Sequence, residues 1–87
     1  MNYKLIDEVF CHEEEGKAFA INANTSNVFE LNDVAKIIVE NLEKESSYKE
    51  ICTKISERFS DIDEKDIRED VDSFMQILVE NQFVIKV

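Results

Sequence analysis

Apolar residues in the first third of the chain alternate with small or polar residues, which is the pattern of half-buried β-strands. The alternation covers residues 5–11, Lys17–Asn22 and Val28–Leu31. A charged segment ending in the only glycine, Gly16, separates the first two, and the asparagine-rich segment 22–27 separates the last two. Both segments have the composition of turns. We predict a three-stranded antiparallel meander with a first hairpin loop of about five residues and a third strand at an exposed edge.

From Asn32 onward, apolar residues are spaced three and four apart, which is typical of amphipathic helices. Three such segments follow, and Asn32, Ser47 and Asp63 each stand where an N-cap residue is expected. Glu50 has the capping-box spacing from Ser47. The closing segment, residues 83–87, is apolar enough to pack back onto the domain or to add a short strand. This order predicts an α+β domain of winged helix-turn-helix type, with the elements β-β-β-α-α-α.

The third helix is the longest, ends near Glu80 and carries two rows of apolar residues. The main row consists of Ile67, Val71, Phe74 and Leu78. The second row, Met75 and Val79, is flanked by Arg68 and Asp72. Such an apolar face is wider than one contact surface requires. The second row therefore either faces a binding partner or packs beneath the C-terminal segment.

Length and composition agree with one folded domain covering residues 1–87. Hydrophobic residues make up 44 % of the chain, which is typical of a protein with a packed core rather than a disordered one. No apolar stretch is long enough to span a bilayer, and the N-terminus lacks the apolar region of a signal peptide. We expect a cytoplasmic protein that does not associate with membranes.

Twenty acidic and ten basic residues give a formal net charge of −10. Phosphate backbones require clustered lysine and arginine, so this balance argues against nucleic-acid binding. The third helix has only Lys65 and Arg68 as basic residues, and a recognition helix of that composition would be repelled by DNA. The same charge attracts basic proteins or peptides.

The usual signatures of catalysis are missing from the sequence. There is one histidine, no nucleophile–base pair and no glycine-rich phosphate loop. His12 stands beside three glutamates, but adjacent residues point in different directions, so we interpret the segment as a solvated hairpin tip and predict no metal site. Cys11 and Cys52 are interpreted as small buried apolar side chains. We predict a protein that is not an enzyme and needs no cofactor.

Acyl carrier proteins are also small and acidic, but they carry a phosphopantetheine serine in an Asp-Ser-Leu setting. The one Asp-Ser pair here, Asp72-Ser73, precedes Phe74 inside a predicted helix. The strand-rich first third also disagrees with that fold.

The segments VFELNDVAKIIVENL, SYKEICTKISERF and DIREDVDSFMQILVENQFV together resemble the PqqD-like family. Leu31-Asn32 matches the step from the third strand into the first helix, and Ser47 with Phe59 matches the ends of the second helix. In the third helix the matching residues are Asp70, Val71, Phe74, Met75 and Leu78. The family often has glycine after the third helix, where this chain has Asn81-Gln82, and asparagine can adopt the same left-handed conformation.

The resemblance implies a RiPP recognition element, which binds the leader region of a ribosomally made precursor peptide and is not itself a catalyst. In the family the leader adds as a strand beside the third strand, in a cleft closed by the third helix. The residues implied to contact the peptide are Asn27, Val28, Phe29, Glu30 and Leu31 on the strand and Arg68, Val71, Asp72, Met75 and Val79 on the helix.

Two partners are implied: the precursor peptide and a separate maturation enzyme, such as a radical-SAM enzyme or a leader peptidase. An acidic leader would have to be bound through Arg68, Lys65 or Lys49, whereas a basic leader would be favoured by the net charge. An exposed edge strand can also pair with another copy of the chain, so both monomer and dimer stay open. The alternative function is a small acidic winged-helix interaction or regulatory domain without a peptide groove.

Overall fold

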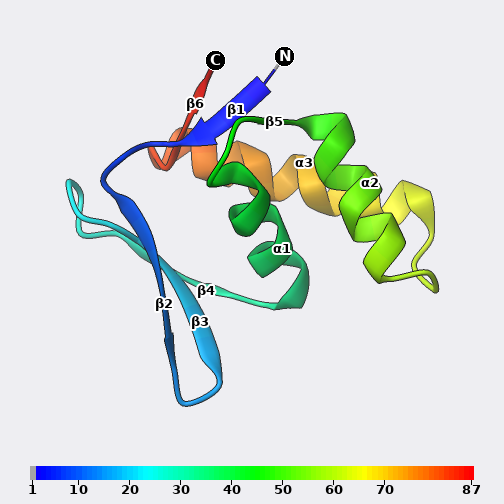
Figure 1. Ribbon diagram of the computed structural model, residues 1–87, viewed down its shortest axis with the longest axis horizontal. Helices are drawn as coiled ribbons and strands as arrows, with labels where there is room; N and C mark the ends of the chain where they lie inside the picture. The colour runs from blue at the N-terminus through cyan, green and yellow to red at the C-terminus, as the bar shows by residue number, and fades with distance from the viewer. Residues whose placement is uncertain (1) are drawn as a thin grey trace.

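The computed structural model describes residues 2–87. These residues form, in chain order, β1 (Asn2–Leu5), β2 (Val9–Glu14), β3 (Lys17–Asn22), β4 (Val28–Leu31), α1 (Asp33–Leu42), β5 (Ser46–Ser47), α2 (Tyr48–Arg58), α3 (Glu64–Glu80) and β6 (Val84–Lys86). The helices pack together, and the long β2–β3 hairpin projects away from them (Figure 1). Both ends of the chain lie side by side, because β6 returns to pair with β1.

The predicted meander is present as a sheet with the strand order β2-β3-β4, and the predicted bounds of its last two strands are confirmed. The first hairpin loop is shorter than predicted. Pairing continues to Glu14 and Lys17, so only Glu15 and Gly16 form the turn, with φ of 52° and 77°. Two successive positive φ angles match the twist of paired strands, and the charged hairpin tip stays in solvent.

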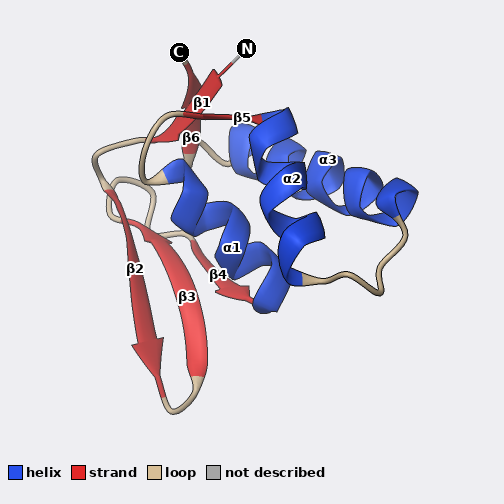
Figure 2. Cartoon of the chain, turned by 45° about the vertical axis from the view of Figure 1, so that its right-hand side comes forward, coloured by secondary structure: helices blue, strands red, loops and turns tan. Residues whose placement is uncertain are grey.

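Residues 5–11 do not form one strand, as the alternation had predicted. The chain turns after β1, where the Val9 N–H donates to the Ile6 carbonyl at 3.1 Å, and β2 begins at Val9. β1 belongs to a second sheet with the order β5-β1-β6 (Figure 2). Its partners come from the middle and the end of the chain. Local alternation cannot reveal such pairing, because it is set by segments far apart in the sequence.

The predicted helix starts are confirmed by their hydrogen bonds. The Asn32 side chain accepts from the Ala35 N–H at 2.8 Å. Ser47 and Glu50 form the predicted capping box, with bonds of 3.1 and 3.3 Å. Asp63 caps α3 by accepting from the Lys65 N–H at 3.3 Å. Each cap satisfies main-chain donors that a helix start would otherwise leave unpaired.

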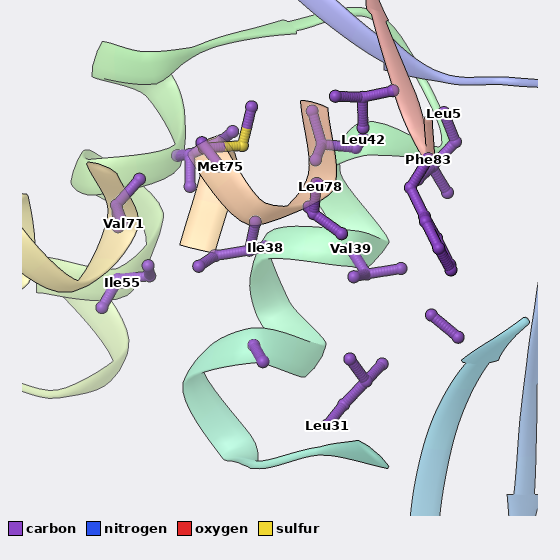
Figure 3. Close-up of a cluster of buried hydrophobic side chains, with 14 of the residues drawn as sticks. Leu5, Leu31, Ile38, Val39, Leu42, Ile55, Val71, Met75, Leu78 and Phe83 are labelled. Atoms are coloured by element: carbon purple, nitrogen blue, oxygen red, sulfur yellow. The ribbon is translucent and has the colours of Figure 1, made fainter. Parts of the chain in front are cut away.

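The hydrophobic core lies between the helices and the inner faces of both sheets (Figure 3). Val71, Met75 and Leu78 of α3 point into it together, with Ile67 one turn earlier. Phe74, predicted as a member of the main buried row, is only partly buried. The buried stripe is therefore rotated about the helix axis relative to the prediction.

The end of α3 is fixed by a left-handed residue and by Phe83. Gln82, and not Asn81, adopts the positive φ, at 64°. The Phe83 N–H then donates to the Leu78 carbonyl at 2.8 Å, which closes the helix end. The Phe83 side chain is fully buried, and its carbonyl accepts from the Ile6 N–H at 3.0 Å. This one residue thus connects α3 with the segment after β1.

Asn22 holds the β3–β4 loop against the end of α3. Its buried side-chain amide donates to the Gln82 carbonyl at 3.0 Å, and its side-chain oxygen accepts from the N–H groups of Asn24 and Thr25. The β4 strand therefore starts from a point anchored to α3.

Replacing Asn22 with alanine is expected to lower the free energy of unfolding by about 1–3 kcal/mol, because the buried side chain makes three hydrogen bonds that alanine cannot replace. Urea unfolding followed by circular dichroism measures this. Asn24→Ala is the matched control: its side chain is exposed, and the change should be within about 0.5 kcal/mol of zero. Equal midpoints for the two variants would show that the Asn22 side chain does not anchor the loop.

Candidate functional site

The fourth strand has an open edge. Within residues 2–87, β4 pairs with β3 on one side and with no strand on the other. The Asn22 N–H donates to the Asn27 carbonyl at the start of the ladder, and hydrogen-bonded pairs recur at every second residue of an antiparallel pair. Main-chain groups of Phe29 are therefore directed to β3. Those of Val28 and Glu30 are directed away from β3 and face the open edge.

The side chains of β4 alternate between the core and solvent. Leu31 is buried and Phe29 half-buried, whereas Val28 and Glu30 are exposed. The Phe29 ring packs on the Phe83 ring, with 4.9 Å between centroids and an interplanar angle of 44°. This contact holds β4 beside the C-terminal end of α3. The strand is therefore packed against the domain on its inner side, while Val28 and Glu30 are exposed.

A groove begins where β4 passes into α1. It lies between the first turns of α1 and one flank of α3, and its volume is about 290 Å³. The lining residues are Asn32, Val34, Ala35 and Ile38 from the α1 side and Asp70, Ser73, Phe74 and Ile77 from α3. Most of these side chains are apolar, and Ile77 is 41 % exposed. An edge strand beside an apolar groove is the arrangement that an added peptide strand can use.

The charged groups at this site are all acidic. Asp70 lines the groove and Glu30 stands on the open strand, and no ion pair within residues 2–87 involves either of them. None of the lining residues is lysine or arginine. The groove therefore presents apolar surface together with uncompensated negative charge.

Basic side chains near the site are paired elsewhere. Lys36 of α1 forms an ion pair with Glu13 of the β2–β3 hairpin. Hydrogen bonding and charge attraction in that pair lower the pKa of Glu13 and raise the pKa of Lys36. Arg68 pairs with Glu64 at 3.3 Å along α3, and its carbonyl accepts from the Tyr48 hydroxyl of α2 at 2.8 Å. Arg68 thus faces the α2 side of α3 and not the groove.

Comparison with known proteins places the chain in a family. The sequence model described as "Coenzyme PQQ synthesis protein D (PqqD)" matches residues 11–84, which is most of the chain. The chain belongs to the PqqD family. No curated protein matches its sequence.

Solved structures similar to this PqqD-family chain include TbiB1 in complex with the TbiA(beta) leader peptide. That structure has a TM-score of 0.81 at 20 % sequence identity, covering 97 % of this chain and 96 % of the other. A second is lasso peptide synthetase B1 complexed with the leader peptide, with a TM-score of 0.79 at 18 % identity, covering 97 % and 98 %. The likeness confirms the predicted α+β, winged-helix-like fold over nearly the whole domain.

The PqqD-family fold brings together the strand half of the sequence-predicted site but not the helix half. Met75 is 5 % exposed and lies in the core, and Val71 is fully buried. Val79 and Asp72 line a separate depression beside Tyr3 of β1. The predicted second row of α3 therefore borders β1 and β6 and lies away from the groove between α1 and α3.

Sequence reasoning assigned none of the eight groove residues to the site: Asn32, Val34, Ala35, Ile38, Asp70, Ser73, Phe74 and Ile77. Phe74 was assigned to the buried row, and Ile77 belonged to neither row. The sequence signal that could have revealed the α3 residues of the groove was the width of the apolar face of this helix. That width shows that one flank is not buried, but it does not say which flank faces the strand edge.

Other candidate chemistry is not assembled around the groove. Among residues 2–87, no group of three or more histidine, cysteine or acidic side chains could hold a metal ion. Cys11 and Cys52 are free thiols, and the prediction that both are buried is wrong, since Cys11 is exposed on edge strand β2. Partial desolvation of its sulfur raises the pKa of Cys11, and the negative charges of Glu43, which caps the end of α1, and of Glu40 in α1 raise it further. No helix in residues 2–87 is long and apolar enough to cross a membrane.

Proposed function

We propose that this protein binds the leader region of a ribosomally synthesised precursor peptide and delivers the precursor to a separate maturation enzyme without catalysing a reaction itself. The observation that carries the proposal is the open edge of β4 beside an apolar groove. Membership of the PqqD family and the leader peptides bound in two structures of the same fold support it.

The leader adds as a strand along β4. The outward N–H and C=O groups of Val28 and Glu30 offer four hydrogen-bonding positions. Side chains of an added strand alternate between two faces, so every second leader residue is directed towards the groove and meets Phe74 and Ile77. Main-chain bonds supply affinity, and the groove selects which side chains enter.

These contacts predict modest affinity. Four main-chain hydrogen bonds at about 1 kcal/mol each and two apolar side chains at about 2 kcal/mol each give roughly 8 kcal/mol. Ordering a flexible peptide removes roughly 2–5 kcal/mol of this. The remainder corresponds to roughly millimolar to tens-of-micromolar dissociation constants. Tighter binding then requires leader contacts beyond β4 or simultaneous contact with the enzyme, whose tethering raises the effective concentration.

The maturation enzyme is a second partner, and a radical-SAM enzyme or a leader peptidase fits this role. Because the leader occupies one edge of the β2–β3–β4 sheet, the other surfaces of the domain stay available to that enzyme. The precursor's reactive region then extends beyond the groove to the enzyme.

Amide chemical-shift mapping tests the proposal. The ¹⁵N-labelled protein is titrated with a synthetic peptide of the leader region encoded beside its own gene. We expect the largest shifts at Val28–Leu31 and at Ser73, Phe74 and Ile77. The protein alone should leave the precursor chemically unchanged.

Two results would contradict leader binding at β4. One is the absence of shifts at peptide concentrations well above the predicted dissociation constants. The other is a set of shifts confined to the hairpin tip, residues 13–16, which would favour an interaction domain without a peptide groove.

A further inference from the structure

We propose that the peptide strand bound at β4 carries a lysine or arginine opposite Glu30 and an apolar residue opposite Val28. Between these two lies a large apolar side chain that enters the groove. This inference rests on the proposed function and specifies the class of peptide that the site accepts.

The solvent-facing side of the β2–β3–β4 sheet already shows two rows of neighbouring side chains. The register gives one row as Phe10, Ile21 and Val28 and the next as His12, Phe19 and Glu30. A strand added at the open edge extends both rows by one residue. The first row is apolar throughout, so an apolar leader residue beside Val28 continues it. The second row ends in a carboxylate.

Glu30 is an exposed carboxylate with no ion pair in residues 2–87, and it stands directly at the position of the new neighbour. Directly opposed residues of paired strands interact, so opposite charges there stabilise pairing and like charges weaken it. The nearest lysine on this face, Lys17, pairs in register with Glu14 at the far end of β3. A basic leader residue is therefore the complement that Glu30 lacks.

The residue between the two outer positions lies opposite Phe29 and is directed to the inner face. There it meets the groove formed by α1 and α3, whose Phe74 and Ile77 side chains are only partly covered. Asp70 lines the same groove, and no basic side chain does. An acidic leader residue would therefore be disfavoured on both faces of the added strand.

The test uses a displayed library of short random peptides, selected on the wild-type protein. One selected peptide, whose binding shifts the β4 amides, is synthesised in two forms, with lysine or with glutamate at the position opposite Glu30. Fluorescence polarisation then gives both dissociation constants for wild type, for Glu30→Lys and for Asp61→Lys. Asp61 is an exposed residue of the α2–α3 loop, so Asp61→Lys changes the net charge equally at a distance from the strand.

Wild type is expected to bind the lysine form about three- to fivefold more tightly than the glutamate form. Glu30→Lys should reverse this preference, and Asp61→Lys should preserve it. Two results would overturn the pairing with Glu30 while leaving leader binding intact. One is that Glu30→Lys prefers the lysine form as strongly as wild type does. The other is that Asp61→Lys changes the preference as much as Glu30→Lys does. If no selected peptide shifts the β4 amides, both the pairing and the proposed function are wrong.

Discussion

Replacing Ile77 with glutamine is expected to weaken leader-peptide binding at least about tenfold without unfolding the protein. Ile77 lines the groove and is 41 % exposed. An inward leader side chain would cover it, so the variant loses apolar contact and buries an amide without a partner. Glutamine keeps the charge unchanged and is a good helix former, which leaves electrostatics and helix stability out of the comparison.

Val79→Gln is the matched control for Ile77→Gln. Val79 is on the same helix and is 40 % exposed. Because it is two positions after Ile77, it is rotated from Ile77 by slightly more than half a helical turn and points to another side of α3. Its side chain lies beside Tyr3 of β1 instead of in the groove. Fluorescence polarisation with the labelled leader peptide should show little change for Val79→Gln. If Val79→Gln weakened binding more than Ile77→Gln, the peptide would contact the face of α3 that was predicted from sequence and not the groove beside Ile77.

Phe83→Ala is expected to lower the free energy of unfolding by about 3–5 kcal/mol, the largest effect of any single change considered for this domain. Phe83 is fully buried and contacts Phe29 of β4. Removing the ring leaves a cavity between α3 and the strand that the leader is proposed to join. Small domains are stable by only about 5–15 kcal/mol, so the variant should unfold at much lower urea concentration.

Phe10→Ala is the matched control, because it makes the same phenylalanine-to-alanine change at an exposed position. Phe10 is 51 % exposed on the outer face of the β2–β3–β4 sheet, so its truncation should cost less than about 1 kcal/mol. Hydrogen exchange adds a second measurement: the Phe29 amide should lose protection in Phe83→Ala more than in Phe10→Ala. Equal urea midpoints for the two variants would show that Phe83 does not hold the strand to α3.

Local signals in the sequence predicted most elements correctly. The alternation at Lys17–Asn22 and Val28–Leu31 gave the bounds of β3 and β4, and Asn32, Ser47 and Asp63 marked the three helix starts. These predictions succeeded because alternation and capping depend on interactions within a few residues of the chain.

Predictions failed where distant segments compete. Residues 5–11 carry a continuous alternation, yet the chain turns within them because β1 pairs with β5 and β6. The first hairpin loop is also shorter than predicted, because Glu15 and Gly16 adopt positive φ angles and let pairing continue to Glu14 and Lys17. For β1, the strands that decide its pairing lie far away in the sequence.

By itself, the sequence determined the fold class, the helix starts and the bounds of β4, because each depends on alternation, spacing or capping within a few residues. Pairing in three dimensions leaves the outer edge of β4 open. Only the tertiary structure decided which flank of α3 lies beside that edge. The apolar face of α3 is wide enough to turn either Phe74 and Ile77 or Met75 and Val79 towards the strand. The packing of Met75 into the core and the contact of Phe83 with Phe29 fix the rotation of the helix, and they leave Ile77 in the groove.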